Sequence, residues 1–221
     1  MCYTKEASIG AFLTAVITSI LLMIYGSQRY QKVNIFFGLM FIFVAFMQLI
    51  DYLIYIDPKC NLGSNQLAGY LGPLFNALQP TIVFVLFIFL IEPTTKSIYS
   101  NHKNFFIVLN LIYLGLVLFY YFDYIKNTNQ CTKEKFGRPL WLWNETRFNS
   151  VFNNGFYLAM LSINLLLLIQ SVPFTIIPVA LIVLLFFVSK INYKYHLGEF
   201  WCFFANSLPL FILIVEKVFF P

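Results

Sequence analysis

The sequence predicts an all-α fold, a polytopic integral membrane protein built as a seven-transmembrane-helix bundle. Three observations predict this fold. Hydrophobic residues make up 60% and charged residues only 10% of the 221 residues, whereas about a quarter of a soluble domain is charged. The apolar residues gather in stretches as long as a helix that crosses a bilayer. Within these stretches they run continuously, without the alternation that is typical of membrane β-strands.

The predicted spans are seven apolar stretches, each close to the roughly 20 residues that a helix needs to cross hydrocarbon. The first stretch is longer than the core of a signal peptide and no small-residue cleavage pattern follows it, so we interpret it as a span. The fifth and sixth are too long together for one span, and Pro173 offers a break between them, so we predict a tight helical hairpin. The spans cover residues 7–25, 35–56, 67–91, 105–124, 150–171, 173–189 and 198–218.

Short connections join most of the spans, and residues 125–149 form the one long connection. We therefore predict a single transmembrane domain over residues 1–221. Because successive spans cross in opposite directions, the N-terminus and the connections 57–66, 125–149 and 190–197 share one side, which we name side B. The other connections and the C-terminus lie on the opposite side, side A.

Two signals about orientation disagree. Most of the Lys and Arg residues outside the spans fall on side B, and the positive-inside rule would make that side cytoplasmic. However, Cys60 and Cys131 also fall on side B, and a disulfide between them fits an oxidising compartment. Asn144 begins a glycosylation sequon on the same side. We therefore predict that side B and the N-terminus are lumenal or extracellular; the alternative is unpaired thiols in cytosolic loops.

Polar side chains inside the predicted spans are the candidates for a functional site, because they are costly in hydrocarbon and often mark function. Residues three apart share a helix face, and two such pairs occur, in the second and third spans. Further polar residues lie in the fifth and seventh spans, and we predict that the second, third, fifth and seventh helices enclose a polar cavity open to side B, suited to a cation, a proton or a small polar ligand. The candidate ligand- or ion-binding residues are Gln48, Asp51, Asn76, Gln79, Glu199 and Asn206.

A structural role is the alternative for the same residues. Asn and Gln side chains often hydrogen-bond neighbouring membrane helices, at about 0.6 kcal/mol apiece. Asp51 and Glu199 would then simply reach the headgroup zone. Under this reading the interior holds no cavity and the polar groups hold the helices together.

Several chemistries find no support in the sequence. His102 and His196 lie in opposite connections, and no His, Cys and carboxylate cluster has metal-ligand spacing, so no metal and no cofactor is predicted. Neither a phosphate-binding loop nor a nucleophile elbow is present, and no catalytic residue is predicted. The basic residues form no run or helix face, which argues against a nucleic-acid partner. The expected partners are the lipid bilayer and a small polar or cationic ligand.

Three short motifs carry a resemblance to a known family. They are Phe46-Met47-Gln48, Leu78-Gln79-Pro80 and Gly198-Glu199-Phe200-Trp201-Cys202. The chain resembles an uncharacterised family of multi-pass membrane proteins in giant DNA viruses and protists, which also has a cysteine where Cys60 stands. That family favours Glu after the Met, where this chain has Gln48, and the departure argues against an ion-binding or catalytic role there. The resemblance implies a viral origin and a role for Gln79, Trp201 and Cys202, but no activity.

Three functions remain open at the level of sequence. The first is transport, conduction or sensing of a small solute or ion, in which Asp51 and Glu199 attract the ligand and Asn76 and Gln79 orient it. The second is a structural or assembly protein of a viral or organellar membrane, whose loops contact partners. The third, an intramembrane enzyme with Asp51 and Glu199 as acid and base, has the least support because no nucleophile or metal site accompanies them.

Overall fold

The computed structural model describes residues 4–91, 98–127, 130–135, 138–140, 155–172, 175–192 and 206–219. Within these ranges the fold is helical apart from one short two-stranded sheet. Three of the predicted features, Glu199, the motif around Trp201 and the sequon at Asn144, lie outside the described residues.

Four helices are long and apolar enough to cross a membrane. They match the first four predicted spans, and a single 3₁₀ turn, η1 (Gln28–Tyr30), precedes the second of them. A short helix, α4 (Ile98–Asn101), precedes the fourth. These findings confirm a helical chain and agree with an integral membrane protein. The four helices are α1 (Lys5–Tyr25), α2 (Gln31–Ile56), α3 (Ser64–Leu90) and α5 (Lys103–Asn127).

Three shorter apolar helices follow, and each overlaps one of the last three predicted spans. They are α7 (Tyr157–Ser171), α8 (Ile176–Asn192) and α10 (Leu208–Phe219). With 15, 17 and 12 residues, they fall short of the roughly 20 residues that cross a full hydrocarbon core. The interruption between α7 and α8 contains Pro173, where the sequence predicts the turn of a helical hairpin.

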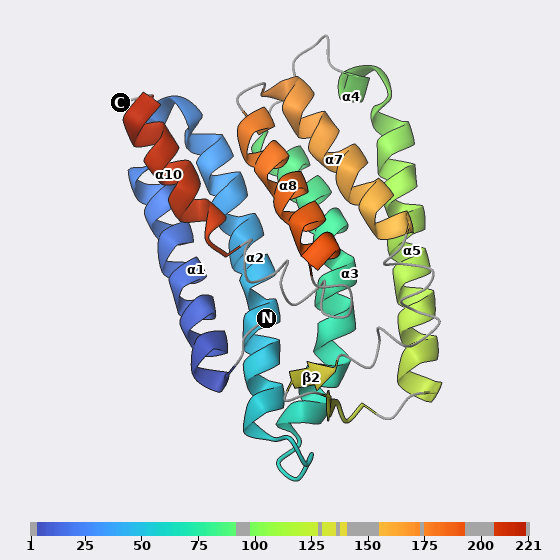
Figure 1. Ribbon diagram of the computed structural model, residues 1–221. Helices are drawn as coiled ribbons and strands as arrows, with labels where there is room; N and C mark the ends of the chain where they lie inside the picture. Colours follow the sequence, from blue (N-terminus) through green and yellow to red (C-terminus); the bar gives the residue numbers. More distant parts are fainter. Residues whose placement is uncertain are drawn as a thin grey trace.

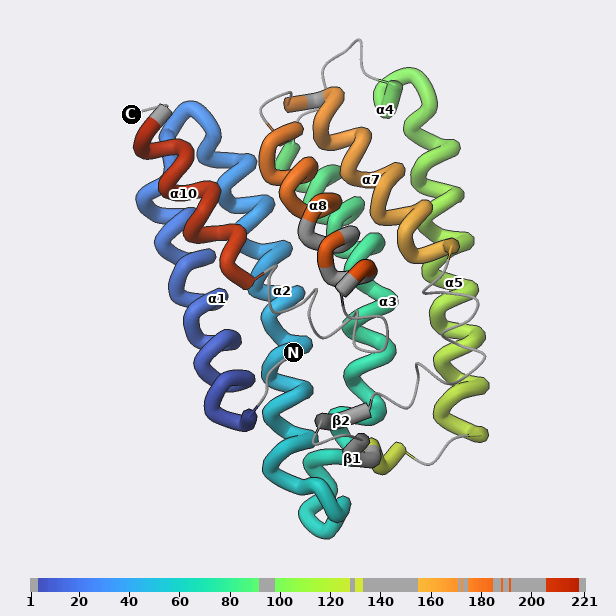
Figure 2. Tube along the Cα trace, viewed as in Figure 1, coloured from blue at the N-terminus to red at the C-terminus, as the bar shows by residue number. Residues whose placement is uncertain are grey.

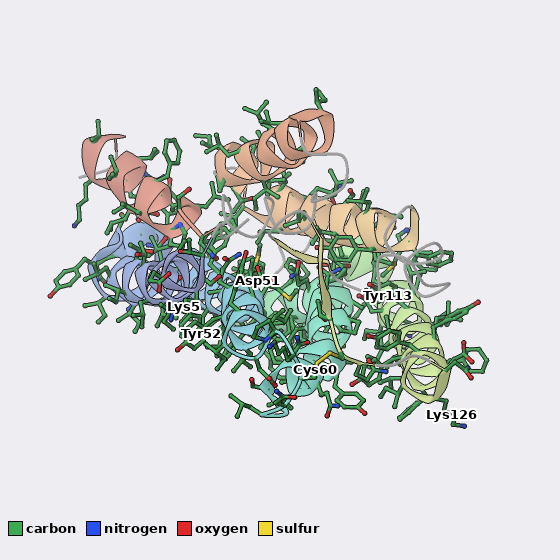
Figure 3. All side chains as sticks on the ribbon, turned by 60° about the horizontal axis from the view of Figure 1, so that its bottom comes forward. Lys5, Asp51, Tyr52, Cys60, Tyr113 and Lys126 are labelled. Atoms are coloured by element: carbon green, nitrogen blue, oxygen red, sulfur yellow. A yellow bond between two sulfur atoms is a disulfide. The ribbon has the colours of Figure 1, made fainter. Side chains whose placement is uncertain are left out.

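The helices form two layers (Figures 1 and 3). The longer helices α1, α2, α3 and α5 stand next to one another in that order, and α10, α8 and α7 form a second layer against them. The second layer covers only the upper half of the view in Figure 1. The α2–α3 connection and the start of α1 lie at one end of the bundle, and the α1–α2 connection and the end of α10 at the other (Figure 2). Of the segments named side B, the start of α1, the α2–α3 connection and the two-stranded sheet lie at the same end of the bundle (Figures 1 and 2).

Local sequence accounts for where the first helices begin and end. The Thr4 hydroxyl accepts a hydrogen bond from the backbone N–H of Ala7 and so caps the start of α1, as N-cap threonines do. Gly63 precedes α3 with a φ of 80°, a left-handed conformation that glycine adopts without steric cost. Pro73 and Pro80 lie inside α3, and each lacks the N–H that would bond the carbonyl four residues earlier.

The two-stranded sheet lies within the long 125–149 connection, where the sequence predicts no regular structure. Strands β1 (Lys133–Lys135) and β2 (Arg138–Leu140) pair antiparallel, with Lys133 opposite Leu140. Three-residue strands are too short to show an alternating pattern. Contact between β2 and α2 supplies the support that such a short ladder lacks by itself.

Candidate functional site

The described candidate residues all point away from the outer surface. Gln48 and Asp51 lie on α2 with 0% and 1% of their surface exposed, and Asn76 and Gln79 lie buried on α3. Asn206 is buried just before α10. The structure thus buries these five side chains, as the sequence predicts. Glu199 lies outside the described residues.

A small pocket lies beside Gln79, in the middle of the bundle. Side chains from four helices line it, including Met40 and Val44 of α2, Leu161 of α7 and Ile182 of α8. Its volume is about 10 Å³, which is room for one water molecule at most. Because the α2 wall of the pocket ends at Val44, the Gln48 and Asp51 side chains lie about one and two turns farther along that helix. The pocket does not join the candidate residues into one cavity.

The side-chain amide of Gln79 has one bonded end and one unbonded end. Its Oε1 accepts a hydrogen bond from the Tyr157 hydroxyl at 2.5 Å, which connects α3 to α7. Its Nε2 is buried and has no hydrogen-bond partner among the described residues. A buried donor without a partner is costly, and the pocket that Gln79 lines has room for one water molecule.

Hydrogen bonds between helices continue on both sides of Gln79. The Tyr113 hydroxyl of α5 donates to the Ala77 carbonyl of α3 at 2.8 Å. Asn164 Nδ2 of α7 donates to the Pro80 carbonyl at 2.8 Å. Both bonds go to α3 carbonyls within three residues of Pro80, which lacks the N–H that would bond the Asn76 carbonyl. They tie α5 and α7 to α3 close to this interruption of its helix ladder.

Asn164 also pairs with Asn110 of α5. Each amide donates to the other, with N···O distances of 3.0 Å and 3.2 Å, and Asn110 Nδ2 donates in addition to the Phe106 carbonyl. Both side chains are buried. We name the whole set the polar seam; it joins α3, α5 and α7 through Ala77, Gln79, Pro80, Asn110, Tyr113, Tyr157 and Asn164.

Sequence reasoning found part of the polar seam. Gln79 is among the predicted residues, but the sequence does not single out Tyr113 or Tyr157. Tyrosine is common at membrane interfaces, and which tyrosine reaches an interior partner depends on how each helix is rotated. No pattern in the sequence reports that rotation.

At side B the structure joins Cys60 and Cys131 in a disulfide, the pair that the sequence suggests. Their Cα atoms are 6.0 Å apart and 71 residues separate them in the chain. Figure 3 shows the bond beside Cys60, at the end of the bundle that also carries Lys5 and Lys126. The disulfide fixes the start of the long 125–149 connection to the α2–α3 connection.

Asn65 and Asp57 reinforce the same junction. Asn65 Nδ2 donates to the carbonyls of Asp57 and Thr132 at 3.1 Å each, and Asn65 Oδ1 accepts from the Thr132 N–H at 2.8 Å. The Asp57 carboxylate accepts from the backbone N–H groups of Asn61 and Leu62. We name this region the side-B cap: the disulfide together with residues 57–65 and 130–132.

The Asp57 carboxyl carries a shifted pKa. Burial of the group acts to raise its pKa, but backbone N–H donors, those of Leu62, Asn65, Asn61 and Gly63, outweigh burial and hold the pKa below its ordinary value of 3.8. Hydrogen bonds donated to a carboxylate favour its charged form. The side-B cap is therefore built around a carboxylate that stays ionised at neutral pH.

A second polar cluster lies at side A, outside the residues that the sequence predicts as a site. Glu216 near the end of α10 is fully buried, and its Oε2 accepts from the Ser27 N–H at 2.8 Å and from Asn34 Nδ2 at 2.9 Å. A carboxylate in the last turn of a helix opposes the helix dipole. That unfavourable position is the signal in the sequence that points to a special partner for Glu216.

Metal ligation and acid–base catalysis find no assembled site in the described ranges. No group of three or more His, Cys, Asp or Glu residues there is close enough to hold a metal ion. The acid–base pair of the enzyme hypothesis needs Glu199, which lies beyond the described ranges. No family model matches the chain, and comparison with curated proteins and with solved structures gives no significant match.

Proposed function

We propose that this chain is a seven-span membrane protein with a structural or assembly role in a viral or organellar membrane. The observation that carries the proposal is that the interior polar groups hydrogen-bond neighbouring helices to one another. The polar seam bonds α3, α5 and α7 to one another, and the pocket at its centre holds one water at most. Interior groups bonded in this way stabilise a fixed packing and leave no path for a solute among the residues that the structure describes.

The proposed seven-span arrangement adds three spans to the four long helices. In this proposal α7, α8 and α10 belong to the fifth, sixth and seventh spans. The alternating order of the helix ends in Figure 1 supports it. The side-B cap would then be the rigid surface that the protein offers to partners on that side.

A second candidate function is the binding or transport of a cation or proton, and Asp51 favours it. Its carboxyl is 1% exposed within a membrane-spanning helix, and Gln48, one turn earlier, is 0% exposed. An ionisable group inside a membrane protein is by default a functional candidate. The structural function tolerates the loss of the Gln79 amide, whereas transport requires the Asp51 carboxylate.

The test is to reconstitute the purified protein in liposomes and to measure cation and proton flux with ion-sensitive dyes. The structural proposal predicts flux no greater than in empty liposomes, and predicts that Gln79→Leu still folds and reaches its membrane. Transport predicts a flux that Asp51→Asn abolishes. The control variant Asp123→Asn changes an exposed acid on α5 and should leave any flux unchanged. A flux that depends on Asp51 would overturn the structural proposal.

A further inference from the structure

The side-A end of the bundle contains a pocket of about 470 Å³ between the end of α1, the turn η1 and the end of α10. It is far larger than the water-sized pocket beside Gln79. Its walls include polar and charged side chains, which the interior pocket almost lacks. The residues that matter here are Tyr25, Ser27, Gln28, Arg29, Glu216 and Lys217.

Glu216 is the buried group in the wall of this pocket. Its side chain is fully buried, and Oε2 accepts from Ser27 and Asn34, yet Oε1 has no hydrogen-bond partner in the described part of the chain. Among the described residues no Lys, Arg or His lies within ion-pair distance of it. A buried carboxylate needs a cation or further donors to offset its desolvation. The pocket therefore has a place for a positively charged donor.

Two cations lie at the mouth of the same pocket. Arg29 and Lys217 are both exposed, and the Arg29 guanidinium lies over the Tyr30 ring, 5.6 Å from its centroid. Arginine and lysine are common partners of phosphate groups. A complementary ligand would thus place its positive group toward Glu216 and its negative group at the mouth.

The surroundings of the pocket are those of a lipid surface. Apolar side chains on α1 and α10, Ile17, Ile24 and Ile214 among them, are exposed on the outside of the bundle, as expected where helices face acyl chains. The pocket lies where these two helices end. Headgroups of membrane lipids occupy that level of a bilayer.

We propose that this pocket binds the headgroup of a phospholipid that carries a primary amine and a phosphodiester, that is, phosphoethanolamine. The ammonium donates to Glu216 Oε1, and Arg29 and Lys217 bind the phosphate. A primary ammonium has three N–H donors, whereas the quaternary ammonium of phosphocholine has none to give to a carboxylate oxygen. The pocket should therefore distinguish the two headgroups.

Native mass spectrometry of the full chain tests the proposal, with phosphatidylethanolamine and phosphatidylcholine of identical acyl chains as probes. The wild type should retain the ethanolamine lipid in preference. Glu216→Gln, which keeps an oxygen for Ser27 and Asn34, should lower that retention at least about tenfold, because losing one partner of a buried charge pair costs this much or more. Glu6→Gln, which changes an exposed acid on α1, should retain the lipid like the wild type.

Two further arms complete the test. Arg29→Gln removes a positive charge at the mouth without changing the Glu216 hydrogen bonds, so it should weaken retention while the melting temperature stays near that of the wild type. Soluble phosphoethanolamine should bind far more weakly than the lipid; equal binding would assign the site to a soluble solute with the same headgroup and overturn the lipid. Equal retention of both lipids, or retention unchanged in Glu216→Gln, would overturn the site. Glu216 would then have only a structural role, through its hydrogen bonds with Ser27 and Asn34. None of these readouts depends on the structural role proposed above.

Discussion

At the scale of single residues, the interior amides behave as matched partners. Asn110 and Asn164 donate to each other, and Asn164 also reaches the Pro80 carbonyl. Each side chain is therefore held by the other, because movement of either one would leave a buried donor without its acceptor. This arrangement makes the energetic consequences of single and double substitutions different, which can be measured.

We expect Asn164→Leu to destabilise the protein by about 1–3 kcal/mol, because it leaves the Asn110 amide buried without its partner. Asn110→Leu should cost a similar amount. The double variant should cost clearly less than the sum, since replacing both partners by apolar groups removes the unbonded donor as well. Reversible unfolding in detergent measures all four free energies of unfolding. Strict additivity of the two single effects would contradict the pairing.

Asp57 gives a pH dependence whose sign follows from its lowered pKa. The hydrogen-bonded carboxylate stabilises the side-B cap above the unfolded-state pKa, close to 3.8, and this stability is lost as pH falls through the lower folded-state pKa. The protection of the residue 57–65 amides, that is, their exchange rate relative to the intrinsic rate at the same pH, should therefore be constant near neutral pH and should fall below about pH 4. In Asp57→Asn the same amides should be less protected at neutral pH, and their protection should not fall further in acid. Equal acid dependence in both proteins would contradict this role.

The sequence predicts which polar residues lie in the interior better than it predicts which groups they bond. Hydrophobic stretches show which polar residues enter the membrane, so Gln48, Asp51, Asn76 and Gln79 are identified as interior residues, and the structure buries them. Which groups they bond is set by helix rotation and by contacts between distant segments. The bond between Tyr157 and Gln79 joins residues 78 positions apart, and no local pattern reports such a contact.

At the scale of elements, α3 is shaped by a close approach on its side-B half. A Cβ atom placed on Gly69 would lie 2.1 Å from the Gln130 carbonyl oxygen, and the Gly69 carbonyl accepts from the Tyr124 hydroxyl. Only glycine lets the start of the 125–149 connection lie directly on the helix. This contact adds to the disulfide in holding the side-B cap.

Gly69→Ala should therefore destabilise the protein and loosen the side-B cap, because the obstructing atom belongs to the backbone of Gln130 and not to a flexible side chain. Gly115→Ala is the matched control: it lies on α5 with no atom within 4 Å of the added Cβ. There the change should be neutral or stabilising by up to about 1 kcal/mol. Melting temperatures in detergent report both effects, and equal shifts in the two variants would contradict the close approach.

The long helices and the short ones differ in how well the sequence predicts them. Four predicted spans coincide with α1, α2, α3 and α5 to within a few residues, because about 20 apolar residues in a row have one stable form in lipid. The break near Pro173 is also predicted from the local sequence, because a proline interrupts a helix. The sequence does not predict the β1–β2 ladder, because three-residue strands carry no pattern of their own and this ladder rests on contact with the distant α2.

At the scale of the whole molecule, the distribution of charge and the disulfide give opposite orientations. The excess of basic residues on side B favours a cytoplasmic side B, whereas the Cys60–Cys131 bond favours a lumenal or extracellular one. We give the disulfide more weight, because a covalent bond between two connections at the same end is more specific than a count of charges.

The orientation can be measured in sealed vesicles of known sidedness. With side B lumenal, a membrane-impermeant maleimide added to the cytosolic face should not label Cys60 or Cys131, even after an impermeant reductant is added on that face. After permeabilisation and reduction both should be labelled. Labelling of either cysteine before permeabilisation would place side B in the cytosol. Peptide mapping separates these two cysteines from Cys2 and Cys202.

The central claim is that the interior is packed and bonded across the helices, without a water-filled path from side B. The most direct test is labelling of single introduced cysteines by a small water-soluble thiosulfonate, with Cys2 and Cys202 replaced by serine. We predict that Val44→Cys, in the pocket wall beside Gln79, and Met47→Cys, next to Gln48, stay unlabelled, while Lys126→Cys at the exposed end of α5 reacts fully. Labelling of the first two at the rate of the third would contradict the claim and establish a hydrated cavity.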